Sequence, residues 1–256
     1  MRSHKVLNIT QPHVHIQNTL QKELGISKVL AQILANRGIR TIKEAEIFLK
    51  PKLEHLLDPY TFTDMQKAVG LVKKAQVAKE RVMVFGDYDV DGITALAILK
   101  ETLNKMGLEV SHHLPHRVKE GYGLNKEIIE TIKKKNVKLL ITADCGISNH
   151  KEIEELRRQN VEVIITDHHE PSSPHLPAAS ATINPKTKDS GYKFRELAGV
   201  GVAFKLAQAL SNSSLEEELD IVSLGTIADS VPLTGENRII AKEGLQRLSQ
   251  TKRHGL

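Results

Sequence analysis

An apolar run meets three alternating carboxylates in the segment Val82-Met83-Val84-Phe85-Gly86-Asp87-Tyr88-Asp89-Val90-Asp91-Gly92. The apolar part predicts a buried strand that ends near Gly86. Three like charges so close together are unfavourable unless a cation neutralises them. A solvated acidic turn, or acids that cap a following helix, would be the alternatives. This segment alone leaves the metal site and the acidic turn both open.

Two further apolar runs end in the same way. Residues 137–143 are followed by Asp144-Cys145-Gly146, and residues 161–166 by Asp167-His168-His169. In an open parallel sheet the carboxyl ends of the strands share one edge, where ligands bind. Three strands would therefore bring carboxylates and imidazoles together, and this pattern predicts a metal site. Oxygen ligands favour Mg²⁺ or Mn²⁺, and the added imidazoles shift the preference toward Mn²⁺ or other transition metals. We interpret Cys145 as a small buried residue.

The chain from residue 80 onward alternates between strand and helix patterns. Strands are expected at 82–86, 109–114, 137–143 and 161–166, with a short one near 181–183. Helices are expected near 93–106, 125–135 and 149–158, and then at 197–211, 215–229 and 237–249. Short crossovers between apolar runs indicate βαβ units. We therefore predict an α/β domain over 80–256, with a mainly parallel sheet flanked by helices.

Residues 1–79 predict a smaller N-terminal part. Residues 1–17 show no periodicity and are expected to form an extended arm. A helical pattern follows from Thr19 to about Lys79, interrupted by Gly38 and Pro51. Within it, residues 41–44 have the Thr-x-x-Glu form of a capping box, and Asp64 is expected to cap a further helix. We interpret 1–79 as an arm and a helical cap without chemistry of its own.

Composition sets broad limits on the kind of protein. The 256 residues include 40% hydrophobic and 26% charged residues, as in ordinary globular proteins. No apolar stretch approaches the roughly 18 residues of a membrane span, and the start lacks a signal peptide, so we expect no membrane association. The single cysteine excludes an internal disulfide and favours a cytoplasmic location. A net charge of +5 permits a polyanionic substrate, although 4% aromatic residues give little sign of a base-stacking surface.

Three further segments carry candidate site residues. Asp229 ends an apolar helix, where it opposes the helix dipole, so either a metal or a nearby Arg or Lys is expected beside it. The segment 117–124, with Arg117 and Gly121, could cradle a phosphate or could be a plain flexible loop. For Gly199-Val200-Gly201 we favour helix packing over a phosphate loop.

The motifs Asp-Tyr-Asp-Val-Asp-Gly (87–92), Asp-Cys-Gly (144–146), Asp-His-His (167–169) and Gly-Thr-Ile-Ala-Asp (225–229) together resemble the DHH phosphoesterase superfamily. Within it, the likeness is to bacterial exonucleases specific for single-stranded DNA. Segments 120–124, 197–205 and 231–233 are similar to the same proteins. The resemblance covers nearly the whole chain and implies a DHH phosphoesterase domain.

The resemblance also implies a two-metal phosphodiesterase that uses Mn²⁺ or Mg²⁺. It assigns the two ions to Asp87, Asp89, Asp91, Asp144, His168 and Asp229. Asp144 would bridge the ions, and His169 would contact the scissile phosphate, whereas Asp87 could be a ligand or could support one. We expect His169, Asp144 and Asp89 to be catalytic. We expect His169, Arg117, Gly121 and Tyr122 to bind substrate.

The implied activity is 5′-to-3′ hydrolysis of single-stranded DNA in repair and recombination. Single-stranded DNA is the expected partner, with a single-strand-binding protein or a helicase as further candidates. The alternatives are a hydrolase of short oligonucleotides or cyclic dinucleotides, and a non-catalytic DNA-binding module. Proteins of this exonuclease class continue beyond the point that corresponds to Leu256, into a second DHH-associated domain and an oligonucleotide-binding fold. We expect metal binding to survive without them, and we leave tight DNA binding and strand polarity open.

Overall fold

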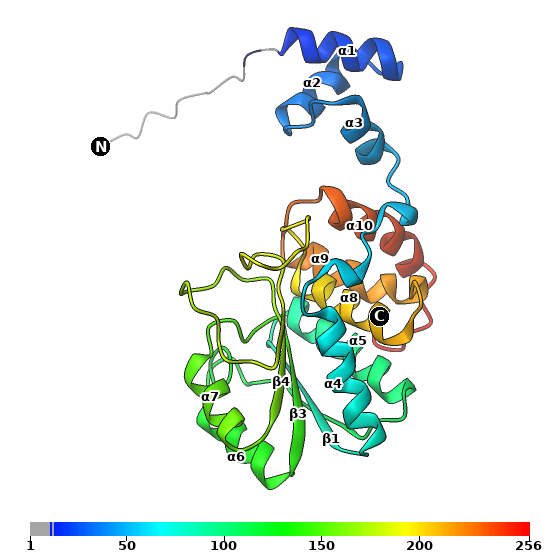
Figure 1. Cartoon of the computed structure of the whole chain (residues 1–256). Helices are drawn as coiled ribbons and strands as arrows, with labels where there is room; N and C mark the ends of the chain where they lie inside the picture. Colours follow the sequence, from blue (N-terminus) through cyan, green and yellow to red (C-terminus); the bar gives the residue numbers. More distant parts are fainter. Residues whose placement is uncertain (1–10, 12) are drawn as a thin grey trace, which may run out of the picture. The chain divides into compact units, whose positions relative to one another are not determined.

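The structure, a computed structural model, describes residue 11 and residues 13–256 (Figure 1). The chain divides into two compact units, residues 1–55 and 56–256. We predicted a boundary between residues 79 and 80, whereas helix α4 (Met65–Val77) belongs to the second unit. The difference arises from tertiary packing, because α4 packs against the sheet and against a helix from the second half of the chain.

The first unit is helical. It contains α1 (Val14–Leu24), α2 (Lys28–Asn36), α3 (Ile42–Leu49) and a 3₁₀ turn (Leu53–His55). The continuous helical pattern breaks at Gly25, which adopts φ +63° after α1, and Ser27 then caps α2 by accepting a hydrogen bond from the Leu30 amide. Thr41 and Glu44 form the predicted capping box. Most of the predicted arm lies outside the described residues, but α1 already begins within its last four residues.

The second unit is built on a five-stranded parallel sheet in the order β2-β1-β3-β4-β5. Its strands are β1 (Arg81–Gly86), β2 (Val110–His113), β3 (Val137–Ala143), β4 (Glu162–Thr166) and β5 (Ala181–Ile183). The predicted α/β class with a mainly parallel sheet is confirmed. The central strands are almost fully buried, which is why they are continuous apolar runs in the sequence.

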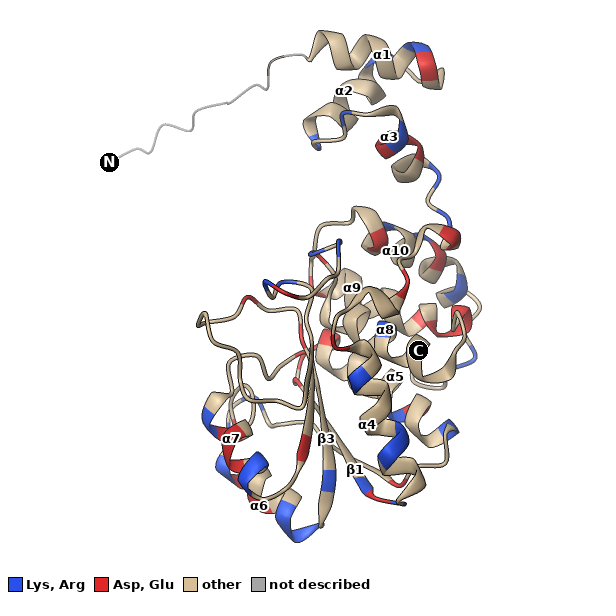
Figure 2. Cartoon of the chain, viewed as in Figure 1, with Lys and Arg blue, Asp and Glu red and all other residues tan. Residues whose placement is uncertain are grey.

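Helices cover both faces of this sheet (Figure 1). The helices that contact the sheet are α4, α5 (Val90–Lys105), α6 (Lys126–Lys134), α7 (His150–Arg158) and α8 (Gly199–Ser211). Two more helices, α9 (Leu219–Ala228) and α10 (Gly235–Leu248), pack on other helices. Helices α6 and α7 bury apolar stripes against one face, and their charged residues lie on the outside, as Figure 2 shows. Helix α5 packs against α8 and α9, and α9 packs against α10. Each fully buried large apolar side chain contributes about 1.5–3 kcal/mol before conformational entropy is subtracted.

A buried ion pair attaches residue 57, at the start of the second unit, to the helices. Lys205 Nζ lies 2.7 Å from Glu236 Oε1, and both side chains are almost fully buried. The pair is completed by the backbone of Leu57, which accepts from Lys205 at 2.8 Å and donates to Glu236 at 2.9 Å. Tyr192 donates its hydroxyl to Glu236 Oε2. Because the two opposite charges are paired and both are hydrogen-bonded further, their burial is tolerated.

The described helices include none that combines the length and the apolar character needed to cross a membrane.

Candidate metal centre

Three aspartates continue the hydrogen-bond ladder of the sheet just beyond its strands. The Asp87 amide donates to the Ala143 carbonyl at 3.2 Å, and the Asp144 amide donates to the Thr166 carbonyl at 2.9 Å. The Asp167 amide in turn donates to the carbonyl that ends β5, at 3.1 Å. The parallel sheet therefore sets these three residues side by side at its carboxyl edge, as the strand pattern predicted.

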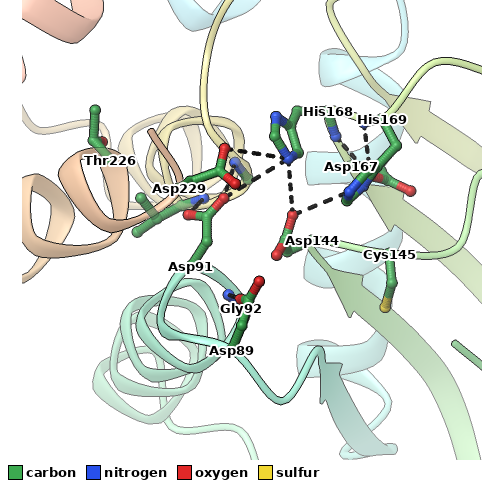
Figure 3. A network of polar contacts seen from close by, with 12 residues as sticks. Asp89, Asp91, Gly92, Asp144, Cys145, Asp167, His168, His169, Thr226 and Asp229 are labelled. Carbon is green, nitrogen blue, oxygen red and sulfur yellow. Dashed lines mark hydrogen bonds and ion pairs between the residues drawn. The ribbon is translucent and has the colours of Figure 1, made fainter. Parts of the chain in front are cut away.

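The turn after β3 directs Asp144 into this edge. Asp144 has φ +64°, a left-handed conformation that costs a non-glycine residue free energy and that aspartate tolerates better than most. Two buried threonines hold the turn: Thr142 Oγ1 donates to the Cys145 carbonyl at 2.7 Å, and Thr166 Oγ1 donates to the Thr142 carbonyl at 2.6 Å. Cys145 is buried and points away from the carboxylates (Figure 3), as predicted.

Asp144 belongs to two of the three groups of potential metal ligands that the described residues form. In each group the ligand atoms are within 4.8 Å of one another: Asp87, Asp89 and Asp144; Asp91, His168 and Asp229; and a third group of Asp144, His168 and His169. His168 Nε2 lies 3.2 Å from Asp144 Oδ1, 3.6 Å from Asp229 Oδ2 and 3.8 Å from Asp91 Oδ2 (Figure 3). The structure thus brings together all six residues that the resemblance assigned to metals.

Several of these groups are buried without hydrogen-bond partners. They are Asp87 Oδ1, Asp144 Oδ1, His168 Nδ1 and His168 Nε2. Burial raises the pKa of Asp144 to about 9, with a contribution from neighbouring carboxylates, and it raises the pKa of Asp91 to about 8. Buried unpaired carboxylates are costly, and divalent cations remove that cost by supplying the missing positive charge. This donor set fits hard divalent ions such as Mn²⁺ or Mg²⁺.

The N-terminus of α8 holds one of these carboxylates. The amides of Gly199 and Val200 donate to Asp91 at 2.6 Å and 2.8 Å. A Cβ atom at Gly199 would lie 2.3 Å from Asp144 Oδ1, so only glycine fits there without moving that side chain. We had favoured helix packing for this segment, and its amides in fact bind a carboxylate as helix N-termini bind anions. No local pattern indicated this pairing, because the two partners are more than 100 residues apart.

Asp167 orients His169 rather than joining the ligand groups. Its fully buried carboxylate accepts from the amides of His168 and His169, from His169 Nδ1 at 2.8 Å, and from the Ile147 amide. The hydrogen bond from His169 Nδ1 to Asp167 raises the pKa of His169 to about 9. The His169 side chain is 46% exposed, and its Nε2 has no partner among the described residues. This nitrogen can therefore donate a hydrogen bond to a ligand. We had not predicted that Asp167 orients His169 in this way.

The predicted substrate residues lie near the centre to different degrees. The Tyr122 hydroxyl is 3.3 Å from His169 Nδ1 and 3.4 Å from the Asp144 carbonyl. Arg117 lies over the ring of Tyr88 at 5.3 Å, and its charge opposes the rise that burial causes in the pKa of Asp87. Gly121 has φ +78°, and a Cβ atom added there would meet nothing within 4 Å.

Glu120 anchors the loop that carries these residues. Its carboxylate lies 2.7 Å from His113 Nε2 and accepts from the His116 amide at 2.8 Å. These two histidines therefore have structural partners within the loop.

Two residues that follow other elements also belong to the metal centre or contact it: Asp229 and Asn184. Asp229 follows α9 directly, and burial raises its pKa while the charges of His168, His169 and Lys186 oppose that rise. Asn184 follows β5, is fully buried, and donates from Nδ2 to the His169 carbonyl at 3.0 Å. Its position after a strand was a signal that the sequence contained and that we did not use.

A parallel α/β sheet with paired carboxylate and imidazole ligands at its carboxyl edge is the arrangement of a metal-dependent phosphoesterase. The family described as "DHH family, N-terminal domain" matches residues 81–226, more than half of the chain. The chain therefore belongs to the DHH family.

Two of the similar proteins carry the same name. The single-stranded-DNA-specific exonuclease RecJ of Bacillus subtilis (strain 168) is 42% identical over 248 residues, which are 97% of this chain and 31% of that protein. RecJ of Escherichia coli (strain K12) is 34% identical over 253 residues, 93% of this chain and 43% of that protein. This chain thus spans less than half the length of either relative.

Solved structures agree with this assignment. RecJ from Thermus thermophilus in complex with Mn²⁺ has a TM-score of 0.77 and 32% identity, covering 95% of this chain and 35% of that chain. An exonuclease RecJ bound to manganese has a TM-score of 0.68 and 38% identity, covering 74% of this chain and 49% of that chain.

Proposed function

We propose that this chain is the catalytic core of a two-metal phosphodiesterase that removes nucleotides from the 5′ end of single-stranded DNA, in repair and recombination. The observation that carries the proposal is Asp144, whose carboxylate is common to two groups of metal ligands. The substrate is taken from the RecJ relatives, each of which is described as specific for single-stranded DNA. Since those relatives are more than twice as long, substrate and polarity belong to the proposal.

The ligand assignment comes from the resemblance, and the positions of the side chains support it. Asp87, Asp89 and Asp144 would hold one Mn²⁺ or Mg²⁺ ion, and Asp91, His168 and Asp229, with Asp144, the other. Two such ions, when bound, supply an activated water and stabilise the charge that develops on the attacking and leaving oxygens. RecJ from Thermus thermophilus has been solved with Mn²⁺ and with Mg²⁺, which supports both choices of ion.

The residues around the ligands would position the substrate. Asp167 keeps a proton on His169 Nδ1, so that the protonated imidazole presents Nε2–H to an oxygen of the scissile phosphate. The amides of α8 fix Asp91 and limit how far its carboxylate can move. Arg117, Gly121 and Tyr122 lie on the loop where the substrate would enter. No covalent protein nucleophile is needed in this scheme.

The proposal also includes a partner protein and a location in the cell. A single-strand-binding protein or a helicase is a proposed partner by resemblance alone. A cytoplasmic location is supported by the single cysteine, which allows no internal disulfide.

The test is hydrolysis of a single-stranded oligonucleotide by the purified chain with Mn²⁺. A 5′-labelled strand should release labelled mononucleotide at once, whereas a 3′-labelled strand should shorten progressively. Duplex DNA, a short oligonucleotide and a cyclic dinucleotide serve as competing substrates. Faster hydrolysis of either small substrate would favour the oligonucleotide or cyclic-dinucleotide hydrolase instead.

Two variants connect this activity to the metal centre. Asp144→Ala should abolish turnover and leave the fold intact, as judged by circular dichroism. Asp189→Asn changes an exposed aspartate outside the centre and should hydrolyse DNA at the wild-type rate. Wild-type turnover by Asp144→Ala would remove Asp144 from the mechanism, and no turnover by the wild type with either metal would contradict the proposed function.

A further inference from the structure

Asn149, the residue just before α7, does not use its side chain to cap that helix. Asparagine at this position usually accepts a hydrogen bond from an amide of the first helical turn, and among the described residues no amide of α7 makes that bond. The side chain instead pairs with a residue 25 positions earlier in the chain. Asn149 Oδ1 accepts from the Leu124 amide, and Nδ2 donates to the Leu124 carbonyl, both at 3.2 Å. Asn149 thus forgoes a local role and holds both backbone groups of a distant loop residue.

The loop is shaped to receive this side chain. Gly123 has φ +78°, and a Cβ atom added there would lie 2.8 Å from Asn149 Oδ1. Both the backbone conformation and the lack of space therefore favour glycine at this position. The next residue, Leu124, is buried in the same apolar cluster as side chains of α6 and α7. The contact between Asn149 and the loop is therefore part of the packed interior.

Asn149 is also attached to the metal centre through its own turn. Its amide donates to the Gly146 carbonyl at 3.0 Å. Ile147, which lies between these two residues, donates its amide to Asp167 Oδ2 at 2.9 Å. The turn begins at Asp144, so one short segment carries both a candidate metal ligand and the side chain that holds the loop.

Tyr122 lies between two points at which its loop is anchored. Glu120 anchors the loop before Tyr122, and Asn149 anchors it after Tyr122. The Tyr122 hydroxyl lies 3.4 Å from the Asp144 carbonyl, and the ring meets the His169 ring edge-on, with centroids 5.8 Å apart. Glycines on both sides of Tyr122 restrain the backbone little. The two anchors therefore determine where the tyrosine ring lies.

We propose that Asn149 is a positioning residue that holds Tyr122 against His169, so that the imidazole is correctly placed for hydrolysis. This inference rests on the proposed function, and it adds a residue that lies outside the metal ligands and outside the motifs that indicated the family. Asp167 holds one nitrogen of the His169 ring, and Tyr122 packs against the ring itself. Releasing the loop would leave the ring with only the first of these two restraints.

The first measurement needs no turnover. NMR of the chain in Mg²⁺, with isotope-labelled tyrosine and histidine rings, detects the nuclear Overhauser contact between Tyr122 and His169. The proteins are the wild type, Asn149→Ala, Asn149→Ser and Asn104→Ala. Serine can still cap α7 but is too short to pair with both backbone groups of Leu124. Asn104 is the matched control, because it is an exposed asparagine on α5.

The contact should be present in the wild type and in Asn104→Ala and absent from both Asn149 variants. Circular dichroism should show that all four proteins are folded, and Asn149→Ser keeps the test valid if Asn149→Ala does not fold. A contact that persists in Asn149→Ser would overturn the inference. So would its absence from the wild type.

The second measurement is the rate of hydrolysis of single-stranded DNA at saturating Mn²⁺. Both Asn149 variants should lower kcat about 5- to 50-fold and change KM by less than about 2-fold, because a displaced group costs stabilisation in the transition state. In a Tyr122→Ala background, Asn149→Ala should cause almost no further loss, since Asn149 acts through Tyr122. A merely structural role would make the two losses multiply, and that result would also overturn the inference.

The two measurements separate this inference from the proposed function. Hydrolysis by the wild type together with independent losses in the two variants removes only the role of Asn149. If no protein hydrolyses DNA but the contact between Tyr122 and His169 still depends on Asn149, the positioning of Tyr122 stands and the enzymatic proposal is removed.

Discussion

The amide of Gly199 donates a hydrogen bond of 2.6 Å to Asp91 Oδ2, which joins the start of α8 to a carboxylate at the start of α5. The next amide of α8, from Val200, bonds the other oxygen of the same carboxylate. Both amides belong to the first turn of a helix, where they have no intrahelical acceptor and where the helix dipole favours an anion. The metal centre is therefore built partly from a helix N-terminus whose role the sequence did not reveal.

Gly199→Ala should weaken Mn²⁺ binding about 10- to 100-fold, the range seen when groups that orient metal ligands are changed. The new Cβ atom would displace Asp144, which it approaches to 2.3 Å. Gly70→Ala is the control, since Gly70 is exposed on α4 and its Cβ would meet nothing within 4 Å. That change should raise the free energy of unfolding by about 0.5–1 kcal/mol and leave metal binding alone. Isothermal titration calorimetry and urea unfolding measure the two effects, and equal Mn²⁺ affinity in both variants would contradict the assigned role of Gly199.

Asp167→Asn should lower activity about 10- to 100-fold at saturating Mn²⁺ while leaving two ions bound. The carboxylate that it removes raises the pKa of His169 to about 9. Without that charge, the pKa of His169 should fall toward the ordinary value of about 6.5. NMR titration of the His169 ring in the metal-free protein checks this shift. A pKa that stays near 9 in the variant would show that another group sets it.

Without metal, the stability of the second unit should fall as pH rises from about 4 to about 9. Asp144 ionises near 3.9 when unfolded but near 9 when folded, so the folded chain binds more protons over this range. His169 acts with the same sign, because its folded pKa of about 9 lies above its unfolded value of about 6.5, and its contribution is lost between these values. Each group contributes a slope of at most about 1.4 kcal/mol per pH unit.

Urea unfolding in EDTA at pH 5, 7 and 9 measures this dependence, and Asp144→Asn isolates the share of one carboxyl group. The variant should lose less stability than the wild type as the pH rises. Added Mn²⁺ should stabilise the wild type more at pH 9 than at pH 5, since ligands must be deprotonated to bind. Parallel pH profiles for the two proteins would contradict the raised pKa of Asp144.

Glu236→Ala should lower the free energy of unfolding by about 3–5 kcal/mol, because it leaves the buried ammonium group of Lys205 without its counter-ion. It also removes the acceptor for the Leu57 amide and the Tyr192 hydroxyl. Glu217→Ala, at an exposed glutamate, should change stability by less than about 0.5 kcal/mol. A loss below about 1 kcal/mol for Glu236→Ala, measured by urea unfolding, would mean that the pair is not needed for stability.

Local patterns predicted the parts of this molecule that depend on local physics. The buried strands could be predicted because both faces of a parallel sheet are covered, so its strands are continuous apolar runs. The site residues after β1, β3 and β4 could be predicted because they stand where these apolar runs stop. The capping box at Thr41 and Glu44 is a four-residue signal and was found for the same reason.

Features that depend on distant packing were missed or misjudged. Asp64 stands before α4 as predicted, but its carboxylate accepts from the Thr182 amide of β5 at 2.8 Å instead of capping the helix. Asn184 and Gly199 act on the centre through residues far away in the chain. Their partners are determined by the arrangement of strands and helices, which periodicity alone does not provide.

The most direct test of the whole account is the number of Mn²⁺ ions that the chain binds. Calorimetric titration, together with electron paramagnetic resonance of the loaded protein, should give two ions per chain that are magnetically coupled, and Asp144→Asn should lose that coupling while Asp189→Asn keeps it. One isolated ion, or none, in the wild-type chain would contradict a shared two-metal centre.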